Sequence, residues 1–482
     1  MKPQTASGLF QKILIANRGE IACRIIRTCQ SLGISTVAVY SEADQDALHV
    51  RLADDAFHIG KASPEESYLN HERILETAIQ CQADAIHPGY GFLAENDVFA
   101  EACLSKGIHF IGPRPESIRE MGSKSRAKQL MQEAGVPVVP GYHGDKQDFK
   151  ILRNEAEKIG FPLLIKPVAG GGGRGMRVVR QLNELEEALT LSRSEAKNAF
   201  GDDNVLLERF IEGPRHIEFQ IFGDQHGNFV HLHERECSIQ RRHQKILEES
   251  PSPFLDETLR KQMAEASLKA ANAVQYLGAG TVEFIVGEDR SFYFIEMNTR
   301  LQVEHPVTEM RTGLDLVEWQ IRVASGEKLP LDQDQIRPKG HSIEVRVCAE
   351  NPERGFLPSS GLLELYDFPE DPSASGSSLI RLDSGFEQKD RVGIHYDSML
   401  AKLIVHGEDR EKALETIQHA LKQTAIIGPE TNLGFLQKLV SHPQFLEGKA
   451  DTLFIDACLP ELLQNEETTP CLLYTSDAAD DP

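Results

Sequence analysis

Hydrophobic and polar positions over the first 120 residues alternate between short apolar runs and helical spacing. Lys12–Ala16 and Thr36–Tyr40 are apolar enough for buried strands. Between them, apolar residues recur at helical spacing until Gly33: Ile21, Ile25, Ile26, Cys29 and Leu32. Strand, helix and strand in this order predict a right-handed parallel crossover. The pattern recurs up to Gly122, so residues 9–123 are predicted to form a doubly wound α/β domain.

Two loops at predicted strand ends lie where such folds bind ligands. Asn17–Glu20 lacks the GxGxxG pattern, so a dinucleotide site is not expected there. His87–Gly91 is rich in glycine, and it is interpreted equally well as a tight structural turn or as a substrate contact.

The strongest strand pattern lies further along, at residues 281–298. Two alternating runs, Thr281–Val286 and Ser291–Met297, flank a polar turn and predict a β-hairpin. With Val286 paired to Ser291, Glu283 lies opposite Phe294. Glu283, Glu296 and Asn298 then share one face, with diagonal neighbours roughly 7–8 Å apart.

Oxygen ligands of this kind suit Mg²⁺ or Mn²⁺ rather than zinc. Without such an ion, two facing carboxylates repel each other and the pKa of one should rise. Polar residues follow at once, namely Arg300, Gln302, Glu304 and His305. The pattern favours a metal and anion site with a base beside it, and the alternative is a solvated strand face.

Four consecutive glycines stand between two predicted strands, Pro162–Pro167 and Arg177–Val179. Glycine contributes no side chain to packing, which favours a flap whose N–H groups close on phosphate oxygens over a plain linker. Lys166 and Lys124 would add positive charge to such a site. The strand Leu206–Ile211 closes a small lid, predicted at about residues 140–211, beside which an adenine would stack.

Residues Gln240–Lys245 form the densest basic and amide-rich cluster in the chain. Two interpretations remain open: a solvated loop, or an anion and nucleotide-ribose site that faces the carboxylates of residues 283–304. His216 is either a ribose contact or a core histidine.

The last third alternates cleanly at HSIEVRVC, which puts Ile343, Val345 and Val347 on one face and Ser342, Glu344, Arg346 and Cys348 on the other. Arg346 is either an ordinary surface arginine or a functional group on that polar face. Further strands and helices predict a mixed α+β domain at residues 340–456, after a central region at 124–335.

The length and composition of the chain limit the classes of function that we expect. A chain of 482 residues predicts two to three domains. The formal charge of −23 argues against a nucleic-acid surface, so no nucleic-acid partner is expected. We find no apolar run of membrane-spanning length and no signal-peptide pattern, and the eight cysteines form no CxxC pair. These features predict a cytoplasmic protein with reduced thiols and no membrane partner.

Five long segments carry a resemblance over about Leu9 to Ile455. They are KILIANRGEIACRIIR, AIHPGYGFLAEN, AGGGGRGMRVV, ECSIQRRHQKILEESP and FIEMNTRLQVEHPVTE. In these segments the chain resembles the biotin carboxylase component of biotin-dependent carboxylases, which are ATP-grasp enzymes. The resemblance implies that residues 124–335 form an ATP-grasp domain.

The resemblance also implies roles for single residues. Glu283, Glu296 and Asn298 would hold Mg²⁺ or Mn²⁺; Arg300, Gln302 and Val303 would bind bicarbonate; Glu304 would be the general base, and Arg346 would stabilise the biotin enolate. ATP would be contacted by Lys124, Lys166, the flap Gly170, Gly171, Gly172, Gly173, Arg174 and Gly175, and by Glu208, Arg209, Ile211, His216, Gln240, His243 and Lys245.

The implied activity is that of a ligase: ATP-dependent carboxylation of biotin with bicarbonate, through carboxyphosphate. VPGYHGDKQD resembles the α subunits of acyl-CoA carboxylases, in particular the methylcrotonyl-CoA type. Implied partners are a biotinyl carrier domain or protein, a carboxyltransferase β subunit and further copies of the chain. No AMKM-type lysine is present, so biotin is expected as a substrate on a carrier and not attached to this chain.

Residues 460–482 continue no pattern, and we expect a disordered tail that is not native to the gene.

Two alternatives to a biotin carboxylase remain. One is another bicarbonate-phosphorylating ATP-grasp ligase, similar to carbamoyl-phosphate synthetase. The other is an inactive homologue that serves as a scaffold subunit.

Overall fold

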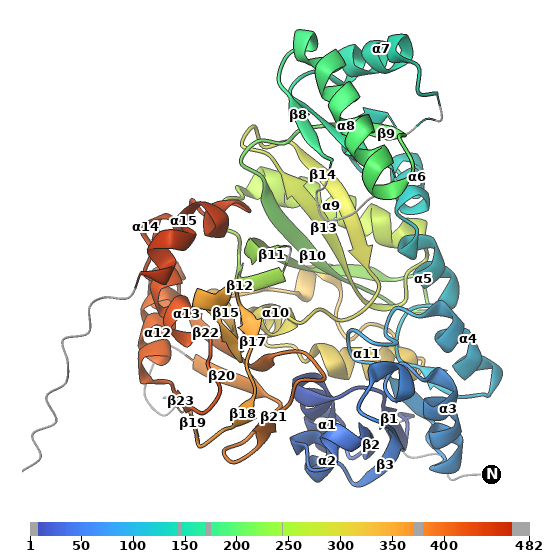
Figure 1. Ribbon diagram of the computed structural model, residues 1–482. Helices are drawn as coiled ribbons and strands as arrows, with labels where there is room; N and C mark the ends of the chain where they lie inside the picture. Colours follow the sequence, from blue (N-terminus) through green and yellow to red (C-terminus); the bar gives the residue numbers. More distant parts are fainter. Residues whose placement is uncertain are drawn as a thin grey trace, which may run out of the picture.

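A computed structural model describes most of the chain, and Figure 1 shows its arrangement. The described residues are 8–142, 144, 146–168, 175–242, 244–369 and 379–464, without the side chains of residues 124, 125, 199 and 200. The elements gather around a five-stranded, an eight-stranded and a four-stranded sheet. The predicted combination of a doubly wound α/β unit with mixed α+β structure is confirmed.

The first sheet is parallel and has the strand order β3-β2-β1-β4-β5. Its strands are β1 (Lys12–Ile15), β2 (Ser35–Ser41), β3 (Asp55–Gly60), β4 (Ala85–His87) and β5 (His109–Phe110). Its helices are α1 (Gly19–Ser31), α2 (Leu48–Leu52), α3 (His71–Gln80), α4 (Asp97–Ser105) and α5 (Pro115–Gly122). Because the chain proceeds from β1 first to one side and then to the other, the sheet is doubly wound, as predicted.

The second sheet is antiparallel and has the order β14-β13-β10-β11-β12-β15-β22-β20. Its strands are β10 (Arg215–Gly223), β11 (Phe229–Arg241), β12 (Gln244–Ser250), β13 (Gly278–Val286), β14 (Phe292–Asn298), β15 (His341–Cys348), β20 (Leu379–Ser384) and β22 (Met399–Gly407). Pairing of β12 with β15 joins the central part of the chain to its last third in one continuous sheet.

Several β-bulges interrupt this second sheet. The register shifts between Phe219 and Ile221, within residues 236–240, between Glu283 and Phe284, and between Val347 and Cys348. A bulge adds one residue to one strand and increases the local twist.

Helices cover the second sheet and its C-terminal extension. They are α6 (Lys124–Glu133), α9 (Glu257–Ala273), α10 (His305–Thr312), α11 (Leu316–Ala324), α12 (Arg410–Gln423), α13 (Leu433–Leu439), α14 (Pro443–Leu446) and α15 (Phe454–Leu463). α9 begins where the Asp256 carboxylate accepts the N–H of Leu259, and its Met263 is buried against the sheet. Short strands complete the last third: β16 (Glu350–Asn351), β17 (Leu357–Pro358), β18 (Gly361–Leu362), β19 (Leu365–Asp367), β21 (Arg391–Val392) and β23 (Ala425–Ile427).

A small lobe, called the lid below, stands apart at the top of Figure 1. It contains β6 (Gly141–Tyr142), β7 (Leu163–Pro167), β8 (Arg177–Val179), β9 (Val205–Arg209), α7 (Phe149–Ile159) and α8 (Leu185–Phe200). Its own core is formed by residues such as Leu152, Leu163, Ile165 and Leu207. The glycine-rich segment predicted as a flap runs between β7 and β8, where residues 169–174 lie outside the described part.

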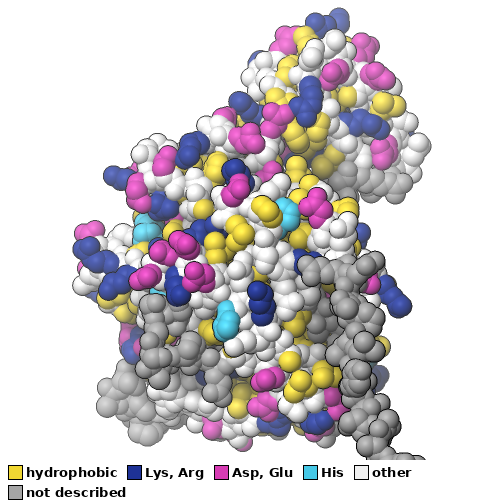
Figure 2. Space-filling view, turned by 90° about the vertical axis from the view of Figure 1, so that its left-hand side faces the viewer, with side chains coloured by type: hydrophobic (Ala, Val, Ile, Leu, Met, Phe, Trp, Pro, Cys, Tyr) yellow, Lys and Arg dark blue, Asp and Glu magenta, His cyan; other side chains and the backbone are white. Residues whose placement is uncertain are grey.

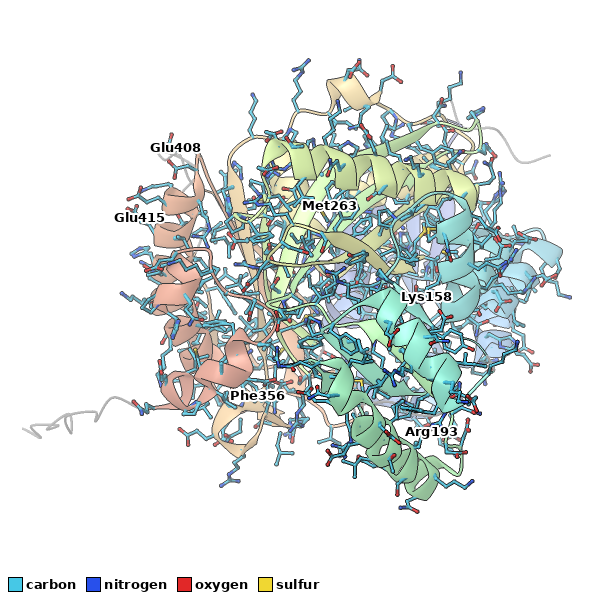
Figure 3. The ribbon with its side chains drawn as sticks, turned by 90° about the horizontal axis from the view of Figure 1, so that it is seen from above. Lys158, Arg193, Met263, Phe356, Glu408 and Glu415 are labelled. Carbon is cyan, nitrogen blue, oxygen red and sulfur yellow. The ribbon has the colours of Figure 1, made fainter. Side chains whose placement is uncertain are left out.

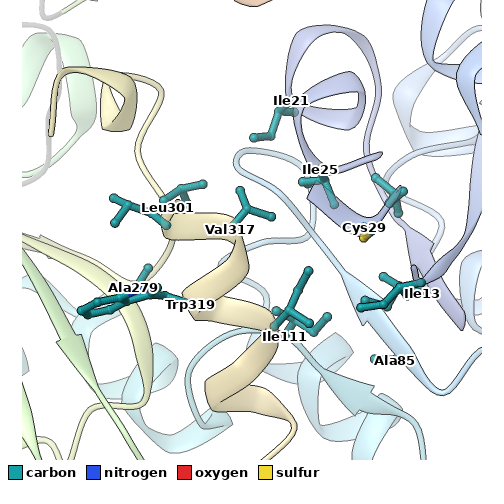
Figure 4. Close-up of a cluster of buried hydrophobic side chains, with 14 of the residues drawn as sticks. Ile13, Ile21, Ile25, Cys29, Ala85, Ile111, Ala279, Leu301, Val317 and Trp319 are labelled. Atoms are coloured by element: carbon teal, nitrogen blue, oxygen red, sulfur yellow. The ribbon is translucent and has the colours of Figure 1, made fainter. Parts of the chain in front are cut away.

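One apolar cluster joins the first sheet to the second (Figure 4). Ile21, Ile25 and Cys29 of α1 lie in the same cluster as Val317 and Trp319 of α11. Trp319 also packs edge to face on Phe222 of β10, with ring centroids 5.4 Å apart. The helical spacing of the α1 residues, which predicted a buried face, thus builds a contact between separate parts of the chain.

The end of the described chain differs from the prediction. α15 continues to Leu463, beyond residue 460 where we expected a disordered tail to begin. Leu462 is buried in the core formed with α12 and α13, which favours helix over a free end. The remaining tail residues, 465–482, lie outside the described part.

We predict that Ile25→Ala lowers the free energy of unfolding by about 2–5 kcal/mol, since it leaves a cavity in a fully buried cluster. Ile79→Ala on α3 is the matched control, because Ile79 is 51% exposed and also lies on a helix. Urea unfolding followed by circular dichroism measures both. An equal effect of the two substitutions would contradict the assigned core.

Candidate active site

A large cleft of about 2570 Å³ lies between the lid, the second sheet and the first and last thirds of the chain. Lys158 of α7 lines it from the lid, and Phe356 lines it from the last third (Figure 3). Arg18 and Tyr90 line it from the first third. Seven of the predicted residues that line the cleft lie on strands of the second sheet: His216, Gln240, Lys245, Glu283, Glu296, Asn298 and Arg346.

The predicted hairpin is present, but its register differs from the expected one. Val286 pairs with Phe292, and Glu283 pairs directly with Glu296. The bulge between these pairs places Phe294 opposite Phe284 in the core, away from the carboxylates. Glu283, Glu296 and Asn298 still share one face, and all three line the cleft. The predicted face is therefore confirmed, and the predicted partner of Glu283 was wrong.

A row of charged residues crosses four strands at this level. Glu296 pairs with Glu283, Glu283 with Glu218, and Glu218 with Arg235. Arg235 is fully buried and donates to Glu218 Oε1 at 2.5 Å, and also to Gln220, Thr308 and Thr281. A buried arginine in this position compensates the charge of Glu218.

Lys245 is the centre of the acidic cluster. Its Nζ donates to Glu218 Oε2 at 2.6 Å, to Glu283 Oε1 at 2.9 Å and to Glu304 Oε1 at 2.7 Å. The three carboxylates are buried and come from β10, β13 and the residue before α10. Lys245, the last residue of the basic cluster, therefore faces the carboxylates of residues 283–304, as the second of our two interpretations predicts. Arg242 and Gln244 are exposed, as the first interpretation predicts, and the anion and nucleotide-ribose site stays a prediction.

These contacts determine how the carboxyl groups ionise. Burial by itself raises the pKa of Glu283, but Lys245 and His216 lower it to well below its ordinary value. His216 Nε2 lies 2.7 Å from Glu283 Oε2. We expected a raised pKa for one of the hairpin carboxylates. For Glu283 the pKa is lowered instead, because Lys245 of β12 and His216 of β10 neutralise its charge, and the expectation for Glu296 stays a prediction.

Glu304 lies between two cations. Its Oε1 accepts from Lys245, and its Oε2 accepts from Arg346 Nη2 at 3.1 Å. Burial raises the pKa of Glu304, and the charges of Lys245, Arg346 and Arg235 overcome this effect and lower it. Arg346 also donates from Nε and Nη2 to Glu248 Oε1, at 2.8 Å and 2.5 Å. Glu304 is thus a carboxylate held ionised at the floor of the cleft.

Arg300 is fixed from several sides. Its Nε donates to Glu95 Oε2 at 2.9 Å, Nη1 to Gln302 Oε1 at 2.7 Å, and Nη2 to Asn298 Oδ1 at 3.0 Å. Glu95 follows β4, so the first third of the chain orients an arginine of the central region. A guanidinium fixed in this way is a rigid donor for an anion such as bicarbonate.

At the lid edge of the cleft, Glu208 of β9 binds two lysines. Lys166 of β7 forms a short ion pair with Glu208, and Lys128 of α6 donates to Glu208 at 2.6 Å. Burial raises the pKa of Glu208, but the two ammonium groups lower it to about 2. This cluster presents positive charge beside the glycine-rich segment.

The oxygen donors of Glu283, Glu296 and Asn298 fit a hard divalent cation. Carboxylate and amide oxygens are the ligands that Mg²⁺ and Mn²⁺ prefer, and no thiol lies among them. Asn298 Nδ2 donates to Glu283 Oε1 at 2.8 Å, so the amide and the carboxylate are already adjacent.

Three protein-family models match the chain. They are the biotin carboxylase N-terminal domain at residues 9–118, the carbamoyl-phosphate synthase L chain ATP-binding domain at 123–332, and the biotin carboxylase C-terminal domain at 344–457. A biotin carboxylase of Nostoc sp. is 51% identical over 92% of this chain and 98% of its own length. The chain belongs to the biotin carboxylase family. The members of this family are ATP-dependent ligases.

A longer relative and a solved structure are also similar to the chain. The methylcrotonoyl-CoA carboxylase subunit alpha of Dictyostelium discoideum is 54% identical over 92% of this chain, which spans 63% of that relative's length. The biotin carboxylase domain of a 2-oxoglutarate carboxylase from Hydrogenobacter thermophilus has a TM-score of 0.83 and 47% identity, covering 95% of this chain and all of that domain. Its structure contains MgADP, ADP and bicarbonate.

The structure brings most of the predicted site residues of this chain to one cleft. Those lining it are Lys166, Glu208, His216, Gln240, Lys245, Glu283, Glu296, Asn298, Arg300, Gln302, Val303, Glu304 and Arg346. Arg209 is exposed and Ile211 is buried, and neither lines it. Gly175 is buried in the lid, with φ +77° and its carbonyl accepting from Ser192. Gly170, Gly171, Gly172, Gly173, Arg174 and His243 lie outside the described residues, as does the Lys124 side chain.

Sequence reasoning missed several groups that shape the site. They are Glu95, Lys128, Glu218, Arg235, Glu248 and Lys402. Glu218 has the same strand alternation as His216, which would have identified its face. The others had no local signal, since their partners are distant in sequence. Lys402, for example, is fully buried and donates to the Val303 carbonyl at 2.8 Å, 99 positions away.

No helix among the residues that the structure describes is long and apolar enough to cross a membrane. Figure 2 shows Lys and Arg side chains interspersed with Asp and Glu over the face in view.

We predict that Lys245→Met destabilises the fold by roughly 3–5 kcal/mol near neutral pH, because it leaves three buried carboxylates without their common cation. The lowered pKa values of Glu283 and Glu304 contribute stability above the unfolded value of about 4.3. That contribution is lost as the pH falls toward the folded values, so the effect of the substitution should shrink below about pH 4.

Urea unfolding near neutral pH and again below about pH 4 measures this difference. Lys261→Met on α9 is the matched control, since it removes the same charge from an exposed position. A loss for Lys245→Met that is independent of pH would contradict the role of Lys245 as a counter-ion.

Proposed function

We propose that this chain catalyses the ATP-dependent carboxylation of biotin on a biotinyl carrier domain or protein, with bicarbonate as the source of the carboxyl group. The products are carboxybiotin, ADP and phosphate. The observation that carries this proposal is the position of Glu304, an ionised carboxylate held between Lys245 and Arg346 in the cleft that Arg300 also lines.

Nucleotide binding is assigned to the cleft edge beside the lid. Lys166, held by Glu208, and Lys245 would neutralise phosphate charge, while His216 and Gln240 line the same wall. Phosphoryl transfer depends mainly on positioning and charge neutralisation, which such groups supply. The glycine-rich segment would close over the phosphates and exclude water from a labile intermediate.

Glu283, Glu296 and Asn298 would hold Mg²⁺ or Mn²⁺. When bound there, the ion supplies further positive charge to the phosphate oxygens. The amide nitrogens of Asn298 and Gln302 both donate to Glu283 Oε1, so they keep this carboxylate in a single orientation.

Bicarbonate is assigned to Arg300, Gln302 and the backbone of Val303. Glu304 would take the proton of the bicarbonate hydroxyl, and a bicarbonate oxygen would then attack the γ-phosphorus of ATP. The bond from this phosphorus to the β-phosphate oxygen breaks, ADP leaves and carboxyphosphate remains. Carboxyphosphate gives CO₂ and phosphate.

The second half of the reaction is assigned to Arg346. The phosphate released from carboxyphosphate takes the proton of the biotin ureido nitrogen, and this nitrogen attacks CO₂ to form the new N–C bond, while negative charge develops on the ureido oxygen. Arg346 would stabilise this enolate oxygen by charge-assisted hydrogen bonds. Because Arg346 also contacts Glu304, the base and the enolate-stabilising group are adjacent.

We further propose that this reaction is the first half of an acyl-CoA carboxylase of the methylcrotonyl-CoA type. Support comes from relatives named methylcrotonoyl-CoA carboxylase subunit alpha at 52–54% identity, of which the chain spans 61–64%. A biotinyl carrier and a carboxyltransferase β subunit would then be partners. The related 2-oxoglutarate carboxylase domain is described as a dimer, which supports self-association.

Cytoplasmic localisation stays a prediction, since several relatives are named mitochondrial.

The alternative of a ligase similar to carbamoyl-phosphate synthetase has less support. The model for its ATP-binding domain matches only residues 123–332, and biotin carboxylase models match on both sides.

We predict that ADP release by the purified chain requires both bicarbonate and free biotin, in the presence of Mg²⁺ and ATP. Glu304→Gln and Arg346→Ala should each lower kcat by about 10²–10⁴-fold, because each removes a proton acceptor or a stabilising charge. Glu76→Gln, at an exposed position on α3, and Arg391→Ala, at an exposed position on β21, are the matched controls.

Biotin-independent ADP release that ammonia stimulates would instead support the carbamoyl-phosphate alternative. A folded chain that binds ATP without turnover would support the scaffold alternative.

A further inference from the structure

Two buried carboxyl groups lie beside Arg346 on the second sheet. Glu344 of β15 and Glu248 of β12 are paired directly across the two strands, and both are fully buried. Arg346 follows Glu344 by two residues on the same face and donates twice to Glu248 Oε1.

Three oxygens of this pair lack a hydrogen-bond donor within the described part of the chain. They are Glu248 Oε2 and both oxygens of Glu344. A buried, ionised carboxylate without donors is costly, and two ionised carboxylates facing each other across a strand pair repel. One proton on the pair would remove the repulsion and supply a donor.

The charged groups around the pair do not compensate Glu344. Arg346 is shared between Glu248 and Glu304, and Lys245 is bound to Glu218, Glu283 and Glu304. Lys402 of β22 donates to the Val303 carbonyl and lies 3.1 Å from Glu20 and 3.8 Å from Asp383. Among the described residues, each nearby cation is thus engaged with another acceptor.

The pKa shifts agree with this geometry. Burial raises the pKa of Glu344 well above its ordinary value; Lys402 opposes the shift, and Glu248 adds to it. Burial likewise raises the pKa of Glu248 to about 7, against the charge of Arg346. Both shifts favour a proton on the pair.

We propose that Glu344 is a positioning residue for Arg346: its carboxyl carries a proton and donates it to the free Oε2 of Glu248. Glu248 is thereby kept as an oriented, ionised acceptor whose other oxygen holds the Arg346 guanidinium. Without this donor, the Glu248 carboxyl would rotate or take up a proton itself, and Arg346 would lose its strongest partner. The role of Arg346 in biotin carboxylation rests on the proposed function, but the protonation of Glu344 does not.

The protonated state can be tested without any activity. The infrared spectrum of the wild-type protein at neutral pH should contain a C=O band of a protonated, buried carboxylic acid. Glu344→Gln should remove this band. If the wild-type minus Glu344→Gln difference spectrum shows only carboxylate bands, Glu344 is ionised and the proposal is wrong.

Thermal stability gives a second test with a defined sign. A raised folded pKa means that Glu344 contributes stability below the unfolded value of about 4.3, and this is lost as the pH rises toward the folded value. Glu344→Gln lacks this loss, so its melting temperature should increase relative to that of the wild type as the pH rises. Glu249→Gln is the matched control on the opposite face of β12.

Glu249 is also buried, but it accepts from His341 and Arg410, which lower its pKa against the effect of burial. Neutralising it should lower the melting temperature at neutral pH. Equal losses in Glu344→Gln and Glu249→Gln would overturn the proposal, because they would show that both carboxyls are ionised.

Kinetics tests the link to Arg346. Glu344→Met removes the donor and should lower kcat for biotin carboxylation by about 10–100-fold, while Glu344→Gln, which keeps an N–H donor, should restore most of it. In an Arg346→Lys background, Glu344→Met should have little further effect, since the two residues act as one unit.

Equal activity of Glu344→Met and Glu344→Gln, or additive effects with Arg346→Lys, would reject a positioning role. An inactive wild-type chain would instead refute the proposed function, and the infrared test would still decide whether Glu344 is protonated.

Discussion

The rest of the site depends on the ion pairs that the Lys245 ammonium group forms. This group bonds to three buried carboxylates that come from separate elements, and no pair of these carboxylates could lie so close without it. Arg235 below and Arg346 beside it continue the same alternation of charge. The site is therefore a small lattice of buried ions, in which each charge keeps its neighbours ionised and in place.

Such a lattice depends on strands for most of its members, namely Glu218, Arg235, Lys245, Glu283 and Arg346, while Arg300 and Glu304 lie between β14 and α10. Ion pairs in a buried environment are favourable only with good geometry, because desolvation is costly. Strands of one sheet fix their spacing and orientation, and residues outside the sheet adjust to them. Glu95 from the first third holds Arg300, and Lys402 from the last third holds the backbone at Val303. Three distant parts of the chain thus converge on residues 298–304.

Much of this arrangement could be predicted from the sequence. Period-two alternation identified the face that carries Glu283 and Asn298, and helical spacing identified the buried side of α1. The partner of Glu283 could not be predicted, because a bulge has no signature in hydrophobicity when both neighbours, Phe294 and Ile295, are apolar. The protonation of Glu248 and Glu344 could not be predicted either, because a sequence does not distinguish a protonated glutamic acid from an ionised one.

The β-bulges of the second sheet have a wider consequence. In a flat sheet, Glu283 on β13 and Arg346 on β15 would be four strand spacings apart, about 19 Å. Lys245 and Glu304 nevertheless connect them through consecutive hydrogen bonds, because the side chains are long and Glu304 lies outside the sheet. The bulge in β14 keeps Glu296 opposite Glu283 on this face of the sheet. Because a shift of one residue turns side chains to the opposite face, one deletion in β14 would turn Glu296 and Asn298 toward the core.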